Sequence, residues 1–341
     1  MRIKKPFLTL IICFAALVLI GGILCAAKIW KPFSAPKGNV EAVSKAIERT
    51  FQVNSLKTNG KIHFSARDEE KSAFIESIFS QKSEELRGYN PKIESVFNLS
   101  IGSAGITLRA EGKLAVLGND VYINLTSLPA SSSLLFGADL SKIKGKWYKI
   151  NREEVAGITG ININSETEKE REKLKELEEK AKAIICRGNI FQIEKNLGTE
   201  MIKGVKTTHY VLAFSKDGFK KSIPELLKTV AEYIPEDRRQ EYDQNLQKFL
   251  DDFSQNFDEL WKTVSLFRFD LWADRFVRRV KLEKTFSSTQ NFSPKLAEGN
   301  IQAEIKIDLY FSDFGKKFNI NPPKEYKKIS DMLLEITGGA E

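Results

Sequence analysis

Two histidines, His63 and His209, are the side chains of this 341-residue chain best suited to proton transfer or metal binding. Each stands in a segment whose pattern predicts a β-strand, and the two segments are far apart in the sequence. A zinc site needs three or four ligands from histidine, cysteine and carboxylate side chains, and neither histidine has a cysteine nearby. We therefore expect two structural strand histidines, with no metal site and no cofactor.

Carboxylates are the other residue type that could do acid–base chemistry. They occur as adjacent pairs, such as Glu153 with Glu154 and Asp251 with Asp252, an arrangement typical of a solvated surface when no cleft surrounds it. The sequence contains no nucleophile elbow, no phosphate-binding loop and no dinucleotide-binding glycine motif. We therefore expect no catalytic residues, and a protein that is not an enzyme.

The net charge of +8 is concentrated at the amino terminus. Residues 1–37 contain six basic side chains and no acidic one, which leaves +2 for the remaining residues. A nucleic-acid-binding domain would carry its own basic excess on one face. We therefore expect no nucleic-acid partner.

The basic amino terminus flanks an apolar segment that predicts a membrane anchor. Pro6 to Ala27 are 22 uncharged residues, and about 20 apolar residues span the hydrocarbon core of a bilayer. The preceding MRIKK favours a cytoplasmic amino terminus. We interpret residues 1–29 as a transmembrane helix that contacts the membrane, residues 30–38 as a linker, and residues 39–341 as one domain outside the cytoplasm of a bacterial cell.

Two other interpretations of this segment stay open. One is a cleaved signal peptide, because Cys25, Ala26 and Ala27 form a weak cleavage site. The other is lipidation of Cys25, although Leu24 precedes it where a small residue would be expected. Of the other two cysteines, Cys13 lies in the apolar segment and Cys186 stands alone in the exported part, so we expect no disulfide there.

The period of apolar residues changes along the rest of the chain. Val40, Val43, Ile47 and Phe51 predict a helix that begins near Asn39. Strict alternation then predicts strands at 61–66, 96–101, 105–117, 120–126 and 141–150. The second half predicts strands at 191–194, 205–214, 264–272, 276–283 and 301–311, and helices at 165–185, 222–234 and 236–263. The fold class is therefore α+β, with a large curved antiparallel sheet that carries helices on one face.

The supply of large apolar side chains suggests a cavity between these two layers. The chain has 23 phenylalanines, and core packing explains most of them. A curved sheet under the amphipathic helix 236–263 can nevertheless leave apolar space that suits an acyl chain. The expected lining comprises Ile106, Leu108, Val121, Ile123, Phe249, Phe253, Ile305, Ile307 and Leu309.

Four segments carry a resemblance to a known family: GKWYKI, GVKTTHYVLAF, FDLWADRFVRRVKLE and FSDFGKKFNINPPKEYKKISDML. Together with the order of helix and sheet, they resemble the lipoprotein-carrier fold of LolA and its relatives LppX and LprG, over about residues 39–335. The resemblance implies an exported half-barrel that carries lipids or lipoproteins and is closed by helices. This chain departs from the pattern in its apparent membrane helix and in the length of helices 165–185 and 236–263.

Arg278 interrupts the alternation of FDLWADRFVRRVKLE. It marks either a β-bulge or a position at the cavity rim, where its planar guanidinium could contact an anionic head group. Two functions remain at this point. The first is a membrane-anchored extracytoplasmic protein that binds a lipid or another hydrophobic ligand. The alternative is a non-catalytic cell-envelope module whose charged helices bind another protein.

Overall fold

The computed structural model describes residues 39–337 except 68–71, 87–89, 104–105, 119, 129–139, 151–171, 174–175, 178, 182, 185–188, 235 and 288–301. The predicted anchor and linker, most of the predicted helix 165–185, and Cys186 lie outside these residues. Within the described ranges, no helix combines the length and the apolar character needed to span a membrane.

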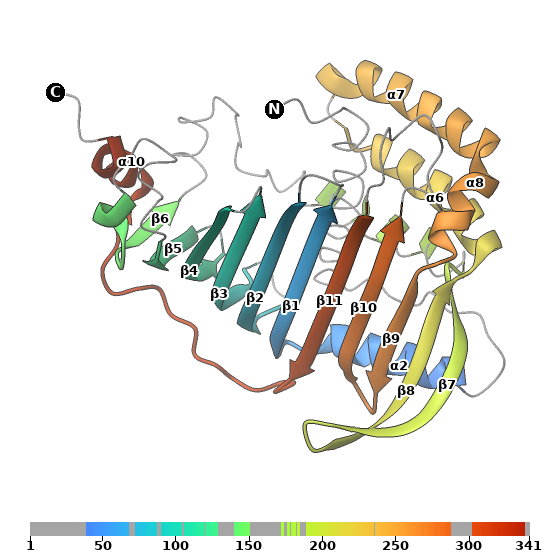
Figure 1. Ribbon diagram of the computed structural model, residues 1–341, viewed down its shortest axis with the longest axis horizontal. Coiled ribbons are helices and arrows are strands. Elements are labelled where there is room, and N and C mark those ends of the chain that lie inside the picture. The colour runs from blue at the N-terminus through green and yellow to red at the C-terminus, as the bar shows by residue number, and fades with distance from the viewer. Residues whose placement is uncertain are drawn as a thin grey trace. The chain divides into compact units, whose positions relative to one another are not determined.

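Strands and helices are divided between two compact units. Unit 1 comprises Met1–Gln52 and Glu166–Ile301, and unit 2 comprises Val53–Ser165 and Gln302–Glu341. All described strand pairs are antiparallel except the short pair of β12 with β6. This confirms the expected α+β class, with extensive and mostly antiparallel sheet structure (Figure 1).

Among its described residues, unit 2 contains eight strands in the spatial order β12-β6-β5-β4-β3-β2-β1-β11. Their bounds are β1 Ser55–Arg67, β2 Ser72–Glu84, β3 Lys92–Ser103, β4 Ile106–Leu117, β5 Asp120–Ser127, β6 Trp147–Ile150, β11 Gln302–Ser312 and β12 Lys327–Lys328. A 3₁₀ turn, η1 (Leu140–Ile143), precedes β6, and the helix α10 (Ile329–Thr337) follows β12. The predicted strand 141–150 is therefore partly wrong, because its first residues form the turn.

In the described part of unit 1, four strands lie in the order β10-β9-β8-β7, and the sequence also forms the helices α2, α6, α7 and α8. Their bounds are α2 Asn39–Gln52, β7 Phe191–Ile202, β8 Val205–Phe214, α6 Lys216–Ala231, α7 Glu236–Gln255, α8 Phe257–Val264, β9 Arg268–Ala273 and β10 Val277–Ser287. The helix α2 contacts β7 and β10, and its buried face includes Val43 and Ile47, as expected. Thr50 accepts a hydrogen bond from the backbone N–H of Val277 at 2.8 Å.

Two helix predictions in unit 1 were wrong in detail. Helix α6 begins at Lys216, where the Ser215 hydroxyl accepts a hydrogen bond from Gly218 N, and not at Ser222. Ser222 is instead fully buried inside the helix. The predicted helix 236–263 consists of two helices, α7 and α8, which are separated at Asn256.

Candidate functional site

The registers of neighbouring strands in unit 2 place many apolar side chains on one face of its sheet. Directly paired residues of neighbouring strands point to the same face, so each continuous series of Cα partners marks a row across the sheet. One such row runs through five strands: Ile305, Phe64, Ile75, Ile101 and Leu108. We call the side of the sheet that carries this row the apolar face.

All seven strand residues predicted to line a cavity lie on the apolar face. On β4 and β11, each of these residues belongs to the row or lies two or four positions from a row residue, and so points to the same face. On β5, Val121 and Ile123 pair with Val116 and Leu114 of β4, which lie on that face as well. These residues are Ile106, Leu108, Val121, Ile123, Ile305, Ile307 and Leu309. Their grouping follows from the registers, whereas their role as the lining of a cavity stays a prediction.

The apolar face is only partly covered. Ile305 is 9% exposed, but Ile75 is 50% exposed, Ile101 42% and Ile106 56%. Ile75 and Ile101 lie on β2 and β3, which have neighbours on both sides in the sheet. Interior strands normally bury their apolar side chains. Ile78 and Val96 on the opposite face are 47% and 49% exposed, so the continuous row of apolar side chains, and not exposure alone, identifies the apolar face as a surface that can receive a hydrophobic partner.

Phenylalanine rings lie close against the backbone on the apolar face. A Cβ atom at Gly60 would come within 2.5 Å of the Phe79 ring, and one at Gly112 within 2.6 Å of the Phe97 ring. Both glycines are therefore required by the close approach of an aromatic ring and not by a turn. Because these rings lie directly over glycine residues, they project less far from the sheet than rings packed against larger side chains would.

At the β6 end, the apolar face is covered by the carboxyl-terminal helix α10. Tyr148 pairs with Ile123, is 2% exposed, and donates a hydrogen bond to Glu335 of α10 at 2.8 Å. Lys146 donates to the same Glu335 oxygen at 2.9 Å, and Lys327 donates to the other oxygen. Three donors therefore converge on one carboxylate and hold α10 against β6.

This carboxylate predicts an acid-sensitive attachment of α10. Hydrogen bonds from Lys327, Lys146 and Tyr148 lower the pKa of Glu335 to about 2. Because the folded-state pKa lies below the unfolded-state value, the stabilisation is complete above about pH 4.5 and is lost as the pH falls toward 2. The hydrogen-exchange protection factors of the amides of Ile329–Thr337 should fall across this window, and Glu335→Gln should remove that pH dependence. Equal acid sensitivity in both proteins would contradict the assignment.

The two predicted helix residues, Phe249 and Phe253, lie on α7 in unit 1. Phe253 is 6% exposed, and its ring centroid lies 5.2 Å from that of Phe257 and 6.5 Å from that of Phe219. These rings form an aromatic cluster with Ile190, against which Phe191, Phe214, Ile223, Leu226, Trp261 and Val264 pack. Phe249 lies beside this cluster and is 42% exposed. Contact of Phe249 or Phe253 with a ligand stays a prediction.

Arg278 occupies a β-bulge, one of the two positions expected for it. The register of β10 with β9 shifts between Val277 and Arg279. The guanidinium donates to both carboxylate oxygens of Asp274, from Nε at 2.9 Å and from Nη2 at 2.8 Å. A head group bound by Arg278 would compete with this bidentate pair, and such a contact stays a prediction.

His209 of unit 1 lies between two carboxylates. Its Nδ1 is 2.7 Å from Glu200 and its Nε2 is 2.8 Å from Asp270. The Trp272 indole stacks on the imidazole at 4.1 Å and donates to Glu200 at 2.7 Å. Hydrogen bonds from Trp272 and His209 lower the pKa of Glu200. As expected, His209 is a hydrogen-bonded strand residue.

The second histidine, His63, lies in unit 2 on β1, 3.3 Å from Glu76 on β2. Among the residues that the structure describes, no group of three or more His, Cys, Asp or Glu side chains is placed to hold a metal ion.

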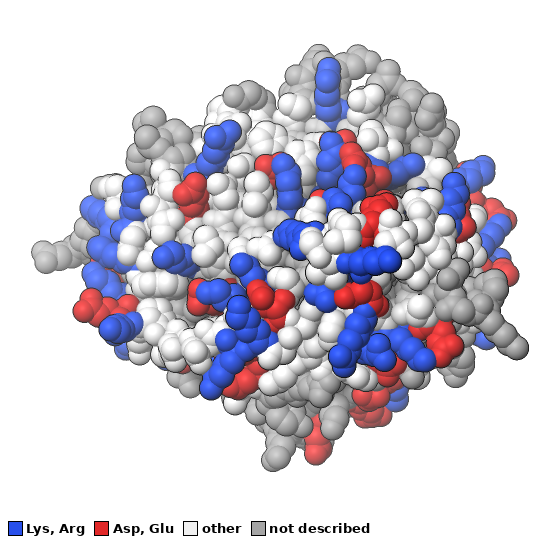
Figure 2. Space-filling view, turned by 90° about the horizontal axis from the view of Figure 1, so that it is seen from below, with Lys and Arg blue, Asp and Glu red and all other residues white. Residues whose placement is uncertain are grey.

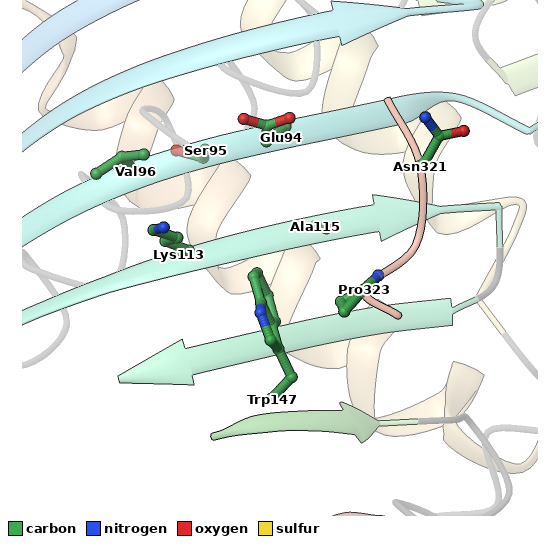
Figure 3. Close-up of a pocket in the computed structure, with 8 residues that line it drawn as sticks. All are labelled: Glu94, Ser95, Val96, Lys113, Ala115, Trp147, Asn321 and Pro323. Atoms are coloured by element: carbon green, nitrogen blue, oxygen red, sulfur yellow. The ribbon is translucent and has the colours of Figure 1, made fainter. Parts of the chain in front are cut away.

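The face of the unit 2 sheet opposite the apolar face holds a small pocket of about 230 Å³ (Figure 3). Its lining consists of Glu94, Ser95, Val96, Lys113, Ala115, Trp147, Asn321 and Pro323. The segment carrying Asn321 and Pro323 crosses the strands, and Glu84 holds its start by accepting from the backbone N–H of Asn319 at 3.0 Å. Ligand sites usually enclose about 300–1,000 Å³, so this pocket is smaller than a usual ligand site.

These features define an α+β protein with a half-exposed apolar sheet face. Two solved structures are similar to the chain. LprF from Mycobacterium bovis has 10% sequence identity and a TM-score of 0.37, with 83% of this chain and 95% of that chain covered. Lipoprotein LppX of Mycobacterium tuberculosis has 9% identity and a TM-score of 0.33, with 82% and 97% covered.

LppX belongs to the group that the sequence motifs resemble. No protein-family profile matches the sequence, and no curated protein does so. Identities and TM-scores this low support no conclusion about a ligand, which has to be argued from the residues of this chain.

Proposed function

We propose that this chain is a non-catalytic, membrane-anchored protein of the bacterial cell envelope that binds a lipid or another hydrophobic ligand. The observation that supports the proposal is the partly covered apolar face of unit 2, with Ile75, Ile101 and Ile106 between 42% and 56% exposed. Apolar surface of this kind, on interior strands, is typical of a binding site in a soluble domain. An acyl chain is the simplest occupant, because each buried CH₂ contributes about 0.8 kcal/mol.

The proposal extends to the parts of the molecule around this face. The sheet of unit 2 curves, and the ligand contacts the predicted lining residues on its apolar face. Residues 1–29 anchor the protein in the cell membrane as a single transmembrane helix and place the rest of the chain outside the cytoplasm. Basic and acidic side chains are interspersed over the face of the molecule that Figure 2 shows.

Native mass spectrometry of the full chain, extracted in a mild detergent, tests this function. We expect a co-purified lipid that adds a discrete mass and that a fluorescent long-chain fatty acid displaces with 1:1 stoichiometry. A detergent-matched control uses a short-chain acid, which buries fewer CH₂ groups and should bind far more weakly. A chain that carries no lipid and takes up no long-chain probe would contradict the proposal.

A further inference from the structure

The hairpin of β7 and β8 in unit 1 extends past the strand beside it. The last residue of β8 paired with β9 is Thr208, opposite Ala273, whereas β7 and β8 remain paired to Ile202 and Val205. Three residues separate Thr199, the partner of Thr208, from the turn. At about 3.3 Å per residue, the apex lies about 10 Å beyond the level of Ala273. We call residues 199–206 the hairpin tip.

The turn at the apex has an unusual residue. Lys203 has a φ of 48° and Gly204 a φ of 80°, and positive φ at both central residues of a two-residue loop is the type I′ geometry. Asparagine or aspartate normally precedes the glycine in such turns, because few other side chains tolerate positive φ. A lysine held there at a conformational cost suggests that its charge has a role at the apex.

The hairpin tip and the strand leading to it combine apolar and basic side chains. Met201 is 63% exposed, and Leu197, a bulged residue of β7, is 53% exposed. Lys195, Lys203 and Lys206 are all exposed. The one acidic residue between positions 195 and 206 is Glu200, whose carboxylate accepts from Trp272 at 2.7 Å.

Edge-strand protection explains part of this pattern but not the apex. Bulges and lysines along an exposed edge prevent pairing with other chains, which accounts for Lys195 and the bulge at Leu197. The same requirement does not favour an exposed methionine next to the turn, or a lysine at a positive φ. Apolar side chains flanked by lysines are instead typical of segments that enter the interfacial region of a membrane, to a depth of about 5–10 Å.

We propose that the hairpin tip docks onto the surface of an anionic phospholipid bilayer, with Met201 entering the interface and Lys203 and Lys206 contacting phosphate groups. The extension of about 10 Å lets the tip enter the interface without immersing β9. Within the tip, Lys203 and Lys206 stand against one carboxylate, Glu200, which is already hydrogen-bonded, and this excess provides the charge complementarity. This contact is separate from the transmembrane anchor and does not depend on a ligand at the apolar face.

A depth-sensitive fluorophore tests the docking. Met201→Cys is introduced into the full chain with Cys13, Cys25 and Cys186 changed to serine, labelled with an environment-sensitive dye, and reconstituted into phosphatidylglycerol–phosphatidylcholine vesicles. We expect a blue-shifted emission that spin-labelled lipids quench. Both effects should weaken in pure phosphatidylcholine and at 0.5 M salt, because each lysine contributes about fivefold to the docked population at low salt.

Substitutions at the apex separate charge from hairpin folding. Lys203→Asn should keep or raise the melting temperature, since asparagine suits the turn, and should lower the docked population about fivefold. Lys203→Arg should retain docking, and Lys248→Glu, a charge reversal on α7, should leave it unchanged. A water-exposed probe in anionic vesicles overturns the proposal. So does a blue shift that persists without anionic lipid, or one seen without vesicles, which would indicate a protein contact.

Discussion

Ile75→Glu should lower the affinity for a long-chain acyl probe by at least about 100-fold. Ile75 stands in the middle of the row that crosses the apolar face, between Phe64 and Ile101, and its side chain is 50% exposed. A carboxylate there would have to lose its hydration when an acyl chain covers it, at a cost of about 3 kcal/mol or more. Because the side chain is half exposed in the free protein, the fold itself should tolerate the change.

The same strand provides a matched control for this substitution. Ile78 lies three residues further along β2, is 47% exposed, and points to the opposite face of the sheet. Ile78→Glu should therefore leave the probe affinity within about twofold of that of the unchanged protein. Fluorescence titration of both variants, with circular dichroism as a check on folding, measures the difference. Equal losses for Ile75→Glu and Ile78→Glu would show that the apolar face is not the binding surface.

Phe257→Ala should destabilise unit 1 by about 3–5 kcal/mol, the usual cost of removing a buried phenylalanine ring. Phe257 is 2% exposed, and its ring lies 5.2 Å from Phe253 and 6.0 Å from Trp261. Truncation removes the contacts of this ring with its neighbours, so the neighbouring rings lose contact energy. No other single truncation in the aromatic cluster removes so large and so deeply buried a side chain.

Phe249 provides the comparison, because it is the same residue type on the adjacent helix but is 42% exposed. Phe249→Ala should cost less than about 1 kcal/mol of unfolding free energy. Urea unfolding, followed by tryptophan fluorescence and circular dichroism, measures both costs. If Phe249 contacts the ligand, its truncation should weaken acyl binding more than it weakens the fold. Similar unfolding costs for both variants would contradict the packing described for Phe257.

Strands with one wet face were predictable from the sequence. The alternation of β4, from Ile106 to Leu117, and of β11 gave both elements within one residue of their observed bounds. The strand β2 was missed, because Phe74 and Ile78 place apolar groups on the second face as well and so hide the period of two. The ring of Phe74 on that second face lies over Gly102, where a Cβ atom would come within 2.0 Å of it.

Helix ends were harder to predict because several residues could supply the same signal. Ser215 and Ser222 both precede apolar residues, but only Ser215 is followed at the third position by a free amide that its hydroxyl reaches. Asn256 divides the predicted helix 236–263, although Leu260 N still bonds to Asn256 O at 3.0 Å. Asparagine favours helix starts over helix interiors, and nothing in the apolar spacing reveals the break.

The sequence predicted which residues of each single strand face inward, but it did not predict the surface that several strands form together. Leu108 and Ile305 could be assigned to the inner face of their own strands, but the sequence does not state which residues of other strands stand beside them. Register decides this, and a shift of one residue would move a whole strand to the other face. Ile75 and Ile101, the exposed centre of the row, were therefore absent from the expected lining.

Photo-crosslinking with a fatty acid that carries a diazirine midway along its chain tests the central claim most directly. The full chain is irradiated with this probe, digested, and analysed by mass spectrometry to locate the modified residues. The account predicts adducts concentrated on β2, β3 and β4 at positions of the apolar face, competed away by the unlabelled acid. Adducts confined to the opposite face, or spread evenly without competition, would contradict it.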